Sequence, residues 1–515
     1  MAFFWFKIFL EININDKNSS PVKKYVLLAL LLCLSIHLFA QDYPKSLLKG
    51  VLYDHNSRQP LMYASIFVIN SNTGVISNEE GQYAIDISSF GLQDSVRFQH
   101  MGYQIKDVAI SDLLHSADVH LEENIINISE TLIFGNEQDP EFIVQQVLLY
   151  ADSNYHKDYS ASEVFVRKRD ESDLLLFKLD YKKSTISDID QEAIAMAEQK
   201  MPRHSTSYTD FLGEMLSSPE KSDSLRIKIK PKKVVSLKDK DITEIDQLAQ
   251  VFEDAFKKTD SLEYWKIKTG IIGSKIGFDF KDTTLNLEVD EMLVKDFADN
   301  LYYDLRDYQF DNEDMWDFLN KPSSYSFTLV GGTQLQGQDI YIIDFSPKNK
   351  GLYKGRLYIS LSSYALLRAD FYYAEGKHGR NFKLMGISFK EEEYKISVNF
   401  EKTDERYHLK YFSFKKVSSF GINRKLALLK KRKKALFDKT LLELKGAIDM
   451  QLRSQQSFEC LLLFHEHISP SDYHHYEQSK KMKVLHVDQF DDNLWQGYDI
   501  LQPTKQMREY KKISY

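Results

Sequence analysis

The strongest constraint on the fold is the segment 442–453, in which apolar and polar side chains alternate without a break. One face holds Leu442, Leu444, Gly446, Ile448, Met450 and Leu452, and the other holds Glu443, Lys445, Ala447, Asp449, Gln451 and Arg453. Such period-two alternation is typical of a β-strand with one buried face, because successive side chains of a strand point to opposite sides. The segment therefore predicts a sheet that is apolar on one side.

Two other segments, 365–373 and 394–400, alternate in the same way and extend the predicted sheet. Three more are strand-like, namely 326–330, 339–345 and 354–361. We expect one strongly curved antiparallel sheet over residues 323–468. The composition agrees, since 13% of the residues are aromatic and aromatic side chains favour strands.

An apolar face of this extent needs a cover, because exposed apolar patches beyond a few hundred Å² are rare on monomers. The charged, helical region 186–262 carries an apolar stripe through Leu248, Val251 and Phe252. We therefore expect helices of this region to pack on the sheet. A partner protein or an apolar ligand is the alternative.

Charge and cysteine content exclude several classes of protein. The whole chain has a net charge of −8 and residues 1–40 have a net charge of +2, so residues 41–515 have a net charge of −10. A mildly acidic body argues against nucleic-acid binding, which needs a basic face. Cys33 and Cys460 are the two cysteines of the chain, which excludes a disulfide scaffold and a cysteine-rich zinc module.

The N-terminus has the three parts of a secretory signal peptide. Lys23 and Lys24 precede a 16-residue apolar run, 25–40, which ends in Ala40 before Gln41. A membrane span is the alternative, but it needs about 20 apolar residues. We expect residues 1–40 to be a leader with its signal peptide, and the protein to be exported to the periplasm or the outer membrane.

Short strands with turn residues between them follow in residues 46–133. Expected strands are 48–53, 64–69, 82–87 and 95–98, and Gly74 and Gly81 stand where turns can need positive φ. The ordered motifs are Gly50-Val51-Leu52-Tyr53-Asp54, Gln59-Pro60-Leu61, Ala64-Ser65-Ile66-Phe67-Val68, Asn72-Thr73-Gly74-Val75, Ser77-Asn78-Glu79-Glu80-Gly81-Gln82-Tyr83 and Met101-Gly102-Tyr103. This pattern resembles the carboxypeptidase regulatory-like domain, which implies a seven-stranded, transthyretin-like (prealbumin-like) sandwich.

That resemblance does not by itself imply peptidase activity. In metallocarboxypeptidases the domain is an accessory fold, and the catalytic part holds zinc with a His-x-x-Glu pair and a distant histidine. Two such strings occur, His120 to Glu123 and His474 to Glu477, and only His486 follows the second. Neither has a third ligand at the family's spacing, so we assign no catalytic, cofactor-binding or metal-binding residue and no cofactor.

A second resemblance covers the middle of the predicted sheet. Segments 338–345, 353–359 and 365–368 look like lipoprotein-carrier-type half-barrels, periplasmic sheets that curl around a hydrophobic cavity. The similarity is mostly strand pattern, which fold analogy alone can produce.

Two clusters of polar residues have both a functional and a structural interpretation. The metal candidate is His465, Glu466, His467, His474 and His475, for which we favour a solvated loop. The basic run is Arg424-Lys425 with 430–434, which suits anionic lipid headgroups, although a solvated face with interleaved leucines is the simpler interpretation.

The sequence thus predicts a β-rich α+β protein in which a transthyretin-like sandwich is followed by helices and a curved antiparallel sheet. The expected regions are 1–40, the sandwich 41–133, a mixed α/β region 134–322, and the sheet with a C-terminal tail 323–515. We expect a non-enzymatic cell-envelope protein with a binding or assembly role at the periplasmic face of the outer membrane. The alternatives are a carboxypeptidase-type hydrolase and a surface glycan-binding module. The sequence does not decide whether the partner is an outer-membrane protein, an apolar ligand or a glycan.

The first prediction concerns processing. Because a short apolar core follows the two lysines, N-terminal sequencing of the exported protein should find a mature end near Gln41. Recovery of an intact 25–40 segment in the inner membrane would establish the anchor instead.

Overall fold

The computed structural model describes residues 47–125, 139–219, 227–238, 263–269, 272–276, 291–495 and 498–511, apart from residues 72, 188, 336, 435, 436 and 499. The expected signal peptide and the apolar stripe through Leu248 lie outside these residues. In the described part of the chain, no helix has the length and apolar character that a membrane crossing requires.

The described residues up to 125 contain seven strands in two sheets. Their bounds are β1 Leu47–Asp54, β2 Ser65–Val68, β3 Gly74–Ile76, β4 Gln82–Asp86, β5 Ser95–Gln99, β6 Lys106–Ala109 and β7 Val119–Leu121, with helix α3 at Ile110–Leu113. The sheet orders are β4-β1-β7 and β3-β2-β5-β6. The four strands expected from the sequence are present within one or two residues of their predicted ends.

The two glycines expected to need positive φ behave differently. Gly81 has a φ of +71°, and a Cβ there would lie 2.7 Å from the carbonyl oxygen of Leu52. Gly74 is an ordinary strand residue, so that expectation is wrong. What excludes a side chain there is packing, because a Cβ on Gly74 would lie 2.9 Å from the Cβ of Phe67.

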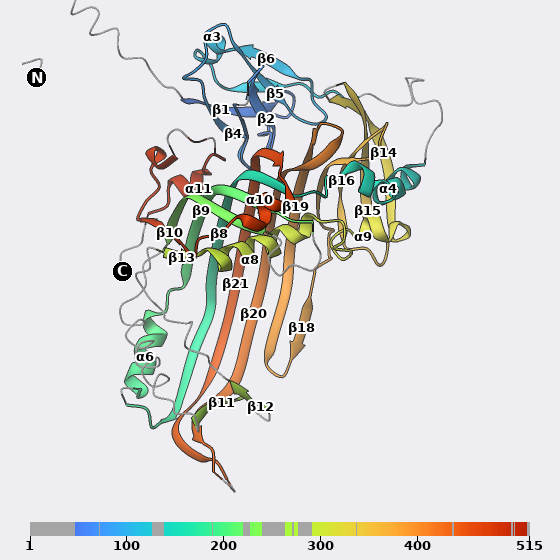
Figure 1. Cartoon of the computed structure of the whole chain (residues 1–515). Coiled ribbons are helices and arrows are strands. Elements are labelled where there is room, and N and C mark those ends of the chain that lie inside the picture. The colour runs from blue at the N-terminus through green and yellow to red at the C-terminus, as the bar shows by residue number, and fades with distance from the viewer. Residues whose placement is uncertain are drawn as a thin grey trace, which may run out of the picture. The chain divides into compact units, whose positions relative to one another are not determined.

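A 14-stranded sheet accounts for most of the rest of the described chain (Figure 1). Its main path runs β14-β15-β16-β17-β19-β20-β21-β8-β9-β10-β23, and β11, β12 and β18 pair off this path. The strands are β8 Ser160–Ser184, β9 His204–Ser217, β10 Ile227–Lys238, β11 Glu263–Thr269, β12 Ile272–Ile276, β14 Tyr325–Leu335, β15 Gln338–Pro347, β16 Tyr353–Ser360, β17 Leu366–Tyr373, β18 Asn381–Leu384, β19 Ile387–Thr403, β20 Arg406–Arg432, β21 Lys439–His467 and β23 Leu485–Val487. Strands of the expected regions 134–322 and 323–515 thus pair in one sheet, and the domain division stays a prediction.

The helices and remaining short elements connect these strands. They are α4 Pro140–Leu149, α5 Ala151–Asn154, α6 Gln191–Lys200, α8 Val294–Leu305, α9 Asp317–Asn320, α10 Pro470–His475 and α11 Lys505–Arg508, with 3₁₀ turns η2 Arg306–Tyr308, η3 Pro322–Ser324 and η4 Asp492–Trp495. A separate two-stranded sheet joins β13 Glu291–Leu293 to β22 Lys481–Lys483. Helix α4 begins with Asp139 as its N-cap and Pro140 in its first turn, where the missing amide of proline costs no hydrogen bond.

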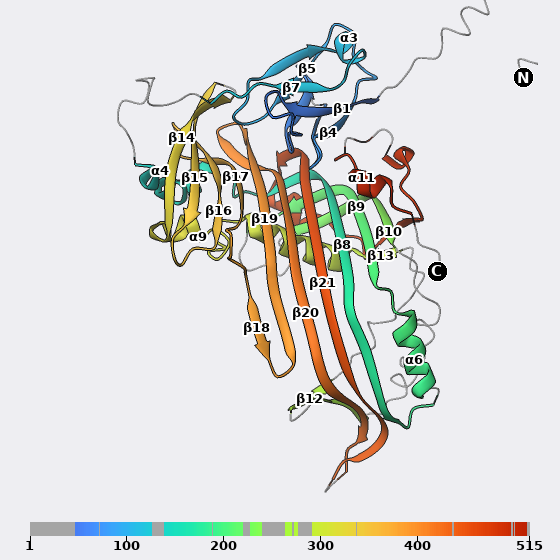
Figure 2. The same cartoon turned by 180° about the vertical axis from the view of Figure 1, so that it is seen from behind.

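The expected cover around Leu248 lies outside the described residues, and within them the sheet is covered mainly by helix α8. Helix α8 packs on the face formed by Val164, Phe211 and Phe458, and its Phe297 ring lies 4.6 Å from the ring of Phe211. Figure 1 shows α8 crossing in front of β8 and β21, and Figure 2 shows these strands from the other side. Of region 186–262, the described part covers only the far end of that face, where Ile186, Ile189 and Ile194 gather around Trp265 of β11.

The opposite face of the sheet packs on the C-terminal segment. Phe165 and Leu461 point to that side, where Trp495, Leu501 and Met507 complete an apolar cluster. Alternation therefore holds along β8 and β21, since Val164, Val166 and Leu462 face α8.

The second prediction tests α8 as the cover. Leu301 is fully buried in the core beneath α8, so Leu301→Ala should lower the free energy of unfolding by about 2–5 kcal/mol in urea denaturation. Tyr303→Ala, on the same helix but 66% exposed, is the matched control and should change it by less than about 0.5 kcal/mol. Equal effects of the two changes would show that α8 does not cover the sheet.

Candidate functional site

The candidate functional site is the part of the α8-side face that lies beyond α8. Directly paired residues share a face, and the pairing places Met450 between Ile422 of β20 and Phe177 of β8. We call this surface the distal apolar face, and its members are Ile387, Phe389, Phe420, Ile422, Leu426, Ile448, Met450, Leu452, Leu174, Phe177, Leu179 and Tyr181. Phe177 is 7% exposed, and the other members are all partly exposed.

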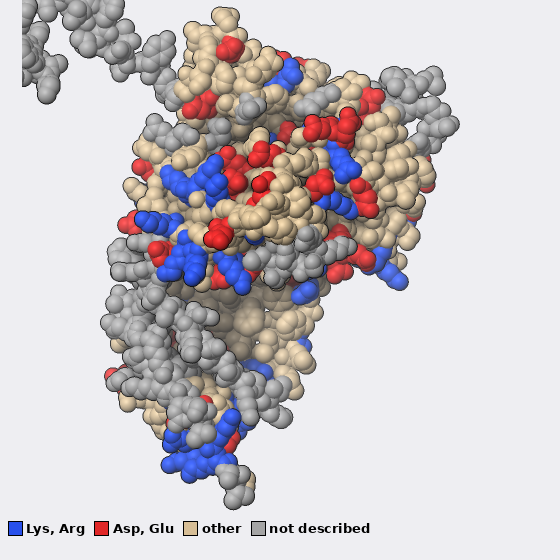
Figure 3. Space-filling model, viewed as in Figure 1, with Lys and Arg blue, Asp and Glu red and all other residues tan. Residues whose placement is uncertain are grey.

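The two ends of the distal apolar face are closed by different elements. Toward α8, Lys168 pairs with Asp304 of that helix, and the face then becomes polar through Asp170, Ser454 and Ser418. At the far end, Trp265 and Ile194 pack against Leu428, Leu442 and Leu444. Figure 3 shows a hollow lined by uncharged residues below the band of charged side chains.

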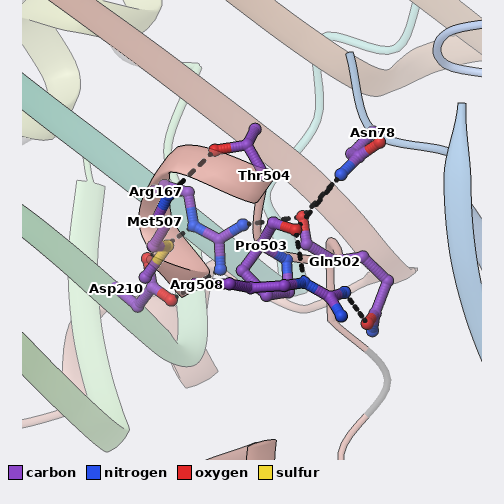
Figure 4. A network of polar contacts seen from close by, with 8 residues as sticks. All are labelled: Asn78, Arg167, Asp210, Gln502, Pro503, Thr504, Met507 and Arg508. Atoms are coloured by element: carbon purple, nitrogen blue, oxygen red, sulfur yellow. Dashed lines mark hydrogen bonds and ion pairs between the residues drawn. The ribbon is translucent and has the colours of Figure 1, made fainter. Parts of the chain in front are cut away.

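The opposite face carries a buried ion pair that holds the C-terminal segment. Arg167 of β8 donates from Nε and Nη2 to Asp210 of β9 at 2.8 and 2.7 Å, and the two residues are 4% and 0% exposed. The remaining Nη1 donates to the carbonyl oxygen of Gln502 at 3.0 Å, which also accepts from Asn78 Nδ2 at 3.2 Å (Figure 4). The C-terminal segment therefore shares its hydrogen bonds with the charge pair.

The segment itself is ordered by its own caps. Thr504 Oγ1 accepts from the Met507 amide at the start of α11, and Arg508 donates to the oxygens of Pro503 and Gln502 (Figure 4). A cavity of about 840 Å³ opens beside Arg167, with Tyr208, Tyr372 and Glu459 in its lining.

Glu459 in that cavity has the most strongly perturbed carboxyl group of the site. Burial raises its pKa to about 7, against the opposing effect of Arg167, and the nearby charge of Glu79 raises it further. The carboxylate accepts a hydrogen bond from Tyr411 Oη at 3.1 Å.

The histidines expected to cluster at 465–475 are separated by the fold. His474 and His475 lie in α10, a helix whose capping box is formed by Ser469 and Asp472, so the solvated loop expected there is a helix. His474 contacts the Tyr159 hydroxyl at 3.3 Å. Glu466 is exposed, at the end of β21.

His465 and His467 instead meet two histidines that are distant in sequence. The rings of His408 and His465 stack at 4.2 Å, and the rings of His156 and His467 lie 4.4 Å apart. Burial lowers the pKa of His408 to about 3 and that of His465 to about 4. Sequence reasoning missed His156 and His408, since no local motif marks either of them.

The two His-x-x-Glu strings have other partners. His120 stacks on Tyr53 and bonds to Arg58 Nη1 at 3.1 Å. The backbone of Glu123 pairs with that of Tyr103 in an isolated antiparallel β-bridge. Glu477 and His486 are exposed. In the basic run, Lys430 and Arg432 are paired with Glu263 of β11 at the end of β20.

Comparisons with known proteins identify the first domain. Residues 48–133 match the family model of the CarboxypepD_reg-like domain, so this part of the resemblance is confirmed. No curated protein matches the sequence.

Similar solved structures include a domain of Vibrio parahaemolyticus named for outer membrane lipoprotein sorting (9% identity, 65% of this chain and 97% of that chain, TM-score 0.19). A second similar structure is a DUF1329 family protein of Desulfovibrio piger, with 10% identity over 66% of this chain and 98% of that chain and a TM-score of 0.19. A third is the MucA/MucB complex of Pseudomonas aeruginosa, with 9% identity over 61% of this chain and 93% of that chain and a TM-score of 0.16. With TM-scores this low we draw no conclusion from them, and the lipoprotein-carrier resemblance stays a prediction.

The third prediction concerns Glu459. Its folded-state pKa lies above the ordinary value of 4.5, so the folded protein loses stability relative to the unfolded chain as pH rises from about 4.5 to about 7. Glu459→Gln keeps an acceptor for Tyr411 and removes this loss. It should raise the free energy of unfolding at pH 8 by on the order of 2 kcal/mol and much less at pH 5, measured in urea.

Glu405→Gln is the control, because that side chain is 94% exposed. It should leave the pH dependence unchanged. A Glu459→Gln variant with the same stability gain at pH 5 and pH 8 would contradict the pKa shift.

Proposed function

We propose that this chain is an exported, non-enzymatic binding protein of the cell envelope, and that its distal apolar face holds the acyl chain of an amphiphile. The observation that carries the proposal is the set of partly exposed aliphatic and aromatic side chains on four paired strands. A contiguous apolar surface of this kind is typical of a binding site, since scattered apolar residues need no partner but patches do.

The dimensions of the face suit a single extended chain. From Leu452 to Gly446 along β21 the face runs about 20 Å, and across the four strands it is about 14 Å wide. An acyl chain in a membrane spans about 15 Å, half of the hydrocarbon core. The described elements at both ends, α8 on one side and α6 with β11 on the other, leave this length between them.

One cation shares the surface with the apolar residues. Arg424 pairs with Ile448 across the strands, so it occupies the same face between Ile422 and Leu426. A guanidinium binds carboxylates and phosphates well because its donors form a planar fork. The positive charge of Arg424 therefore favours an acidic headgroup over a basic one on the acyl chain.

The alternative functions have weaker support. For a carboxypeptidase-type hydrolase, the histidines of both His-x-x-Glu strings are already engaged, His120 by Arg58 and His474 by Tyr159. A glycan-binding module is favoured only by the cavity beside Arg167, where Tyr372 is 43% exposed. Sugar rings stack on such exposed aromatic side chains.

The fourth prediction tests the proposal with a fluorescent probe, dansyl-labelled undecanoic acid. The purified protein should bind it saturably, and Met450→Asp should weaken binding at least tenfold, because a carboxylate would then face the acyl chain without a partner. Met450 is partly exposed, so the added charge need not unfold the sheet.

Gln451→Asp is the matched control, because the neighbouring residue adds the same charge to the opposite face of the same strand. It should bind the probe as the unchanged protein does. Equal losses in both variants, or no saturable binding by the unchanged protein, would refute acyl-chain binding at this face.

A further inference from the structure

The ends of β20 and β21 meet the segment between α5 and β8 in a cluster of histidines away from the distal apolar face. His156 and Asp158 come from that segment, and His467 is the last residue of β21. Two hydrogen bonds fix the segment on the sheet, because the His156 amide donates to the carbonyl oxygen of Tyr407 at 2.9 Å and the Tyr155 hydroxyl donates to that of Leu366 at 2.7 Å.

The hydrogen bonds of His156 fix which of its ring nitrogens carries a lone pair. Nε2 lies 3.3 Å from the carbonyl oxygen of Thr403, an atom that only accepts, so Nε2 carries the proton. In the neutral ring Nδ1 is then the acceptor nitrogen. Such a backbone hydrogen bond on the far nitrogen is the usual outer-shell partner of a metal-binding histidine.

That acceptor nitrogen is buried and lacks a hydrogen bond. The His156 side chain is 10% exposed, and Nδ1 has no hydrogen-bond partner among the described residues. Nδ1 lies 4.0 Å from Asp158 Oδ2, so a lone pair and a carboxylate oxygen face one another beyond hydrogen-bond distance. A cation between them would satisfy both acceptors.

His467 completes a set of three ligands. One ligand atom each from His156, Asp158 and His467 lies within 4.8 Å of the others. A tetrahedral zinc ion with bonds of about 2.0–2.2 Å has ligand atoms about 3.3 Å apart, so small side-chain rotations suffice. Two imidazoles and a carboxylate are ligands that zinc and its first-row neighbours prefer over magnesium or calcium.

We propose that His156, Asp158 and His467 bind a divalent transition metal ion, with zinc as the ion to test, and that the ion joins the segment before β8 to the end of β21. Three protein ligands leave a fourth position for water. The site differs from both His-x-x-Glu strings and involves neither His474 nor His120.

A second group of possible ligands supplies a contrast. Glu171, Asp173 and His204 also lie close together, but their polar atoms have partners. His204 Nδ1 lies 2.7 Å from Asp173 and its Nε2 2.9 Å from Thr206, while Glu171 pairs with Arg169. The polar atoms of this group are thus already engaged, whereas Nδ1 of His156 has no hydrogen-bond partner among the described residues.

The fifth prediction is tested by zinc titration of the purified protein after dialysis against a chelator. Calorimetry should find one zinc ion per chain, and zinc should raise the melting temperature, because an ion that binds only the folded state stabilises it. His467→Ala and Asp158→Asn should each weaken zinc binding at least tenfold and abolish the rise in melting temperature. His467 and Asp158 are exposed, so both variants should fold.

His474→Ala is the matched control, an exposed histidine seven residues further along that lies in α10. It should bind zinc like the unchanged protein, and excess magnesium should not compete. Absence of saturable zinc binding, unaltered binding by His467→Ala or Asp158→Asn, or an equal loss in His474→Ala would each overturn the proposal. None of these outcomes bears on the acyl probe.

Discussion

The continuous pairing of β8, β20 and β21 is the constraint on which the rest of the structure depends. The three strands have 25, 27 and 29 residues, and β21 pairs with both neighbours along nearly its whole length. A strand of 29 residues is about 95 Å long, whereas a 12-residue helix such as α8 is about 18 Å long and 10 Å wide. Helix α8 by itself cannot cover strands of this length, and the apolar row that continues beyond it is less buried in the part of the chain that the structure describes.

Register is the risk that accompanies such strands, because a slip of one residue turns every side chain to the other face. The ion pair of Arg167 and Asp210 resists a slip between β8 and β9, since it would leave a buried charge unpaired, at a cost of about 3–5 kcal/mol. The same arginine donates to the carbonyl oxygen of Gln502, so a slip between β8 and β9 would also disturb a contact of the C-terminal segment. The pairing of β21 with β8 shifts register at two bulges, one between Gln451 and Leu452 and one between Lys445 and Gly446. The apolar rows of the two strands stay on the same face of the sheet across both bulges.

Alternation predicted the strands well because it is a local signal. The segment 442–453 has one apolar face as expected, and the seven strands of the first domain follow motifs that lie close together in the sequence. The partners of these strands could not be predicted, since β21 pairs with β8 across almost 300 residues with no local mark of the pairing. Sequence analysis did not single out Val294–Leu305 as a cover, because its apolar residues stand among aspartates and tyrosines. The stripe at Leu248 lies outside the described residues. For the histidines, proximity in sequence favoured His474, whereas the fold brings in His156 from the segment before β8.

The two proposed sites use the same strands, and this sets how one can affect the other. His467 and Leu452 are 15 residues apart on β21, which is about 50 Å, several times the distance over which exposed charges interact at physiological salt. A direct electrostatic effect of the metal ion on an acyl ligand is therefore excluded, and only the strands can couple the sites. Strand ends fray before strand centres open, because they have fewer packed neighbours. An ion between His156 and His467 would close the end at which β21 meets the segment before β8, and it would hold in register the rows that make up the distal apolar face.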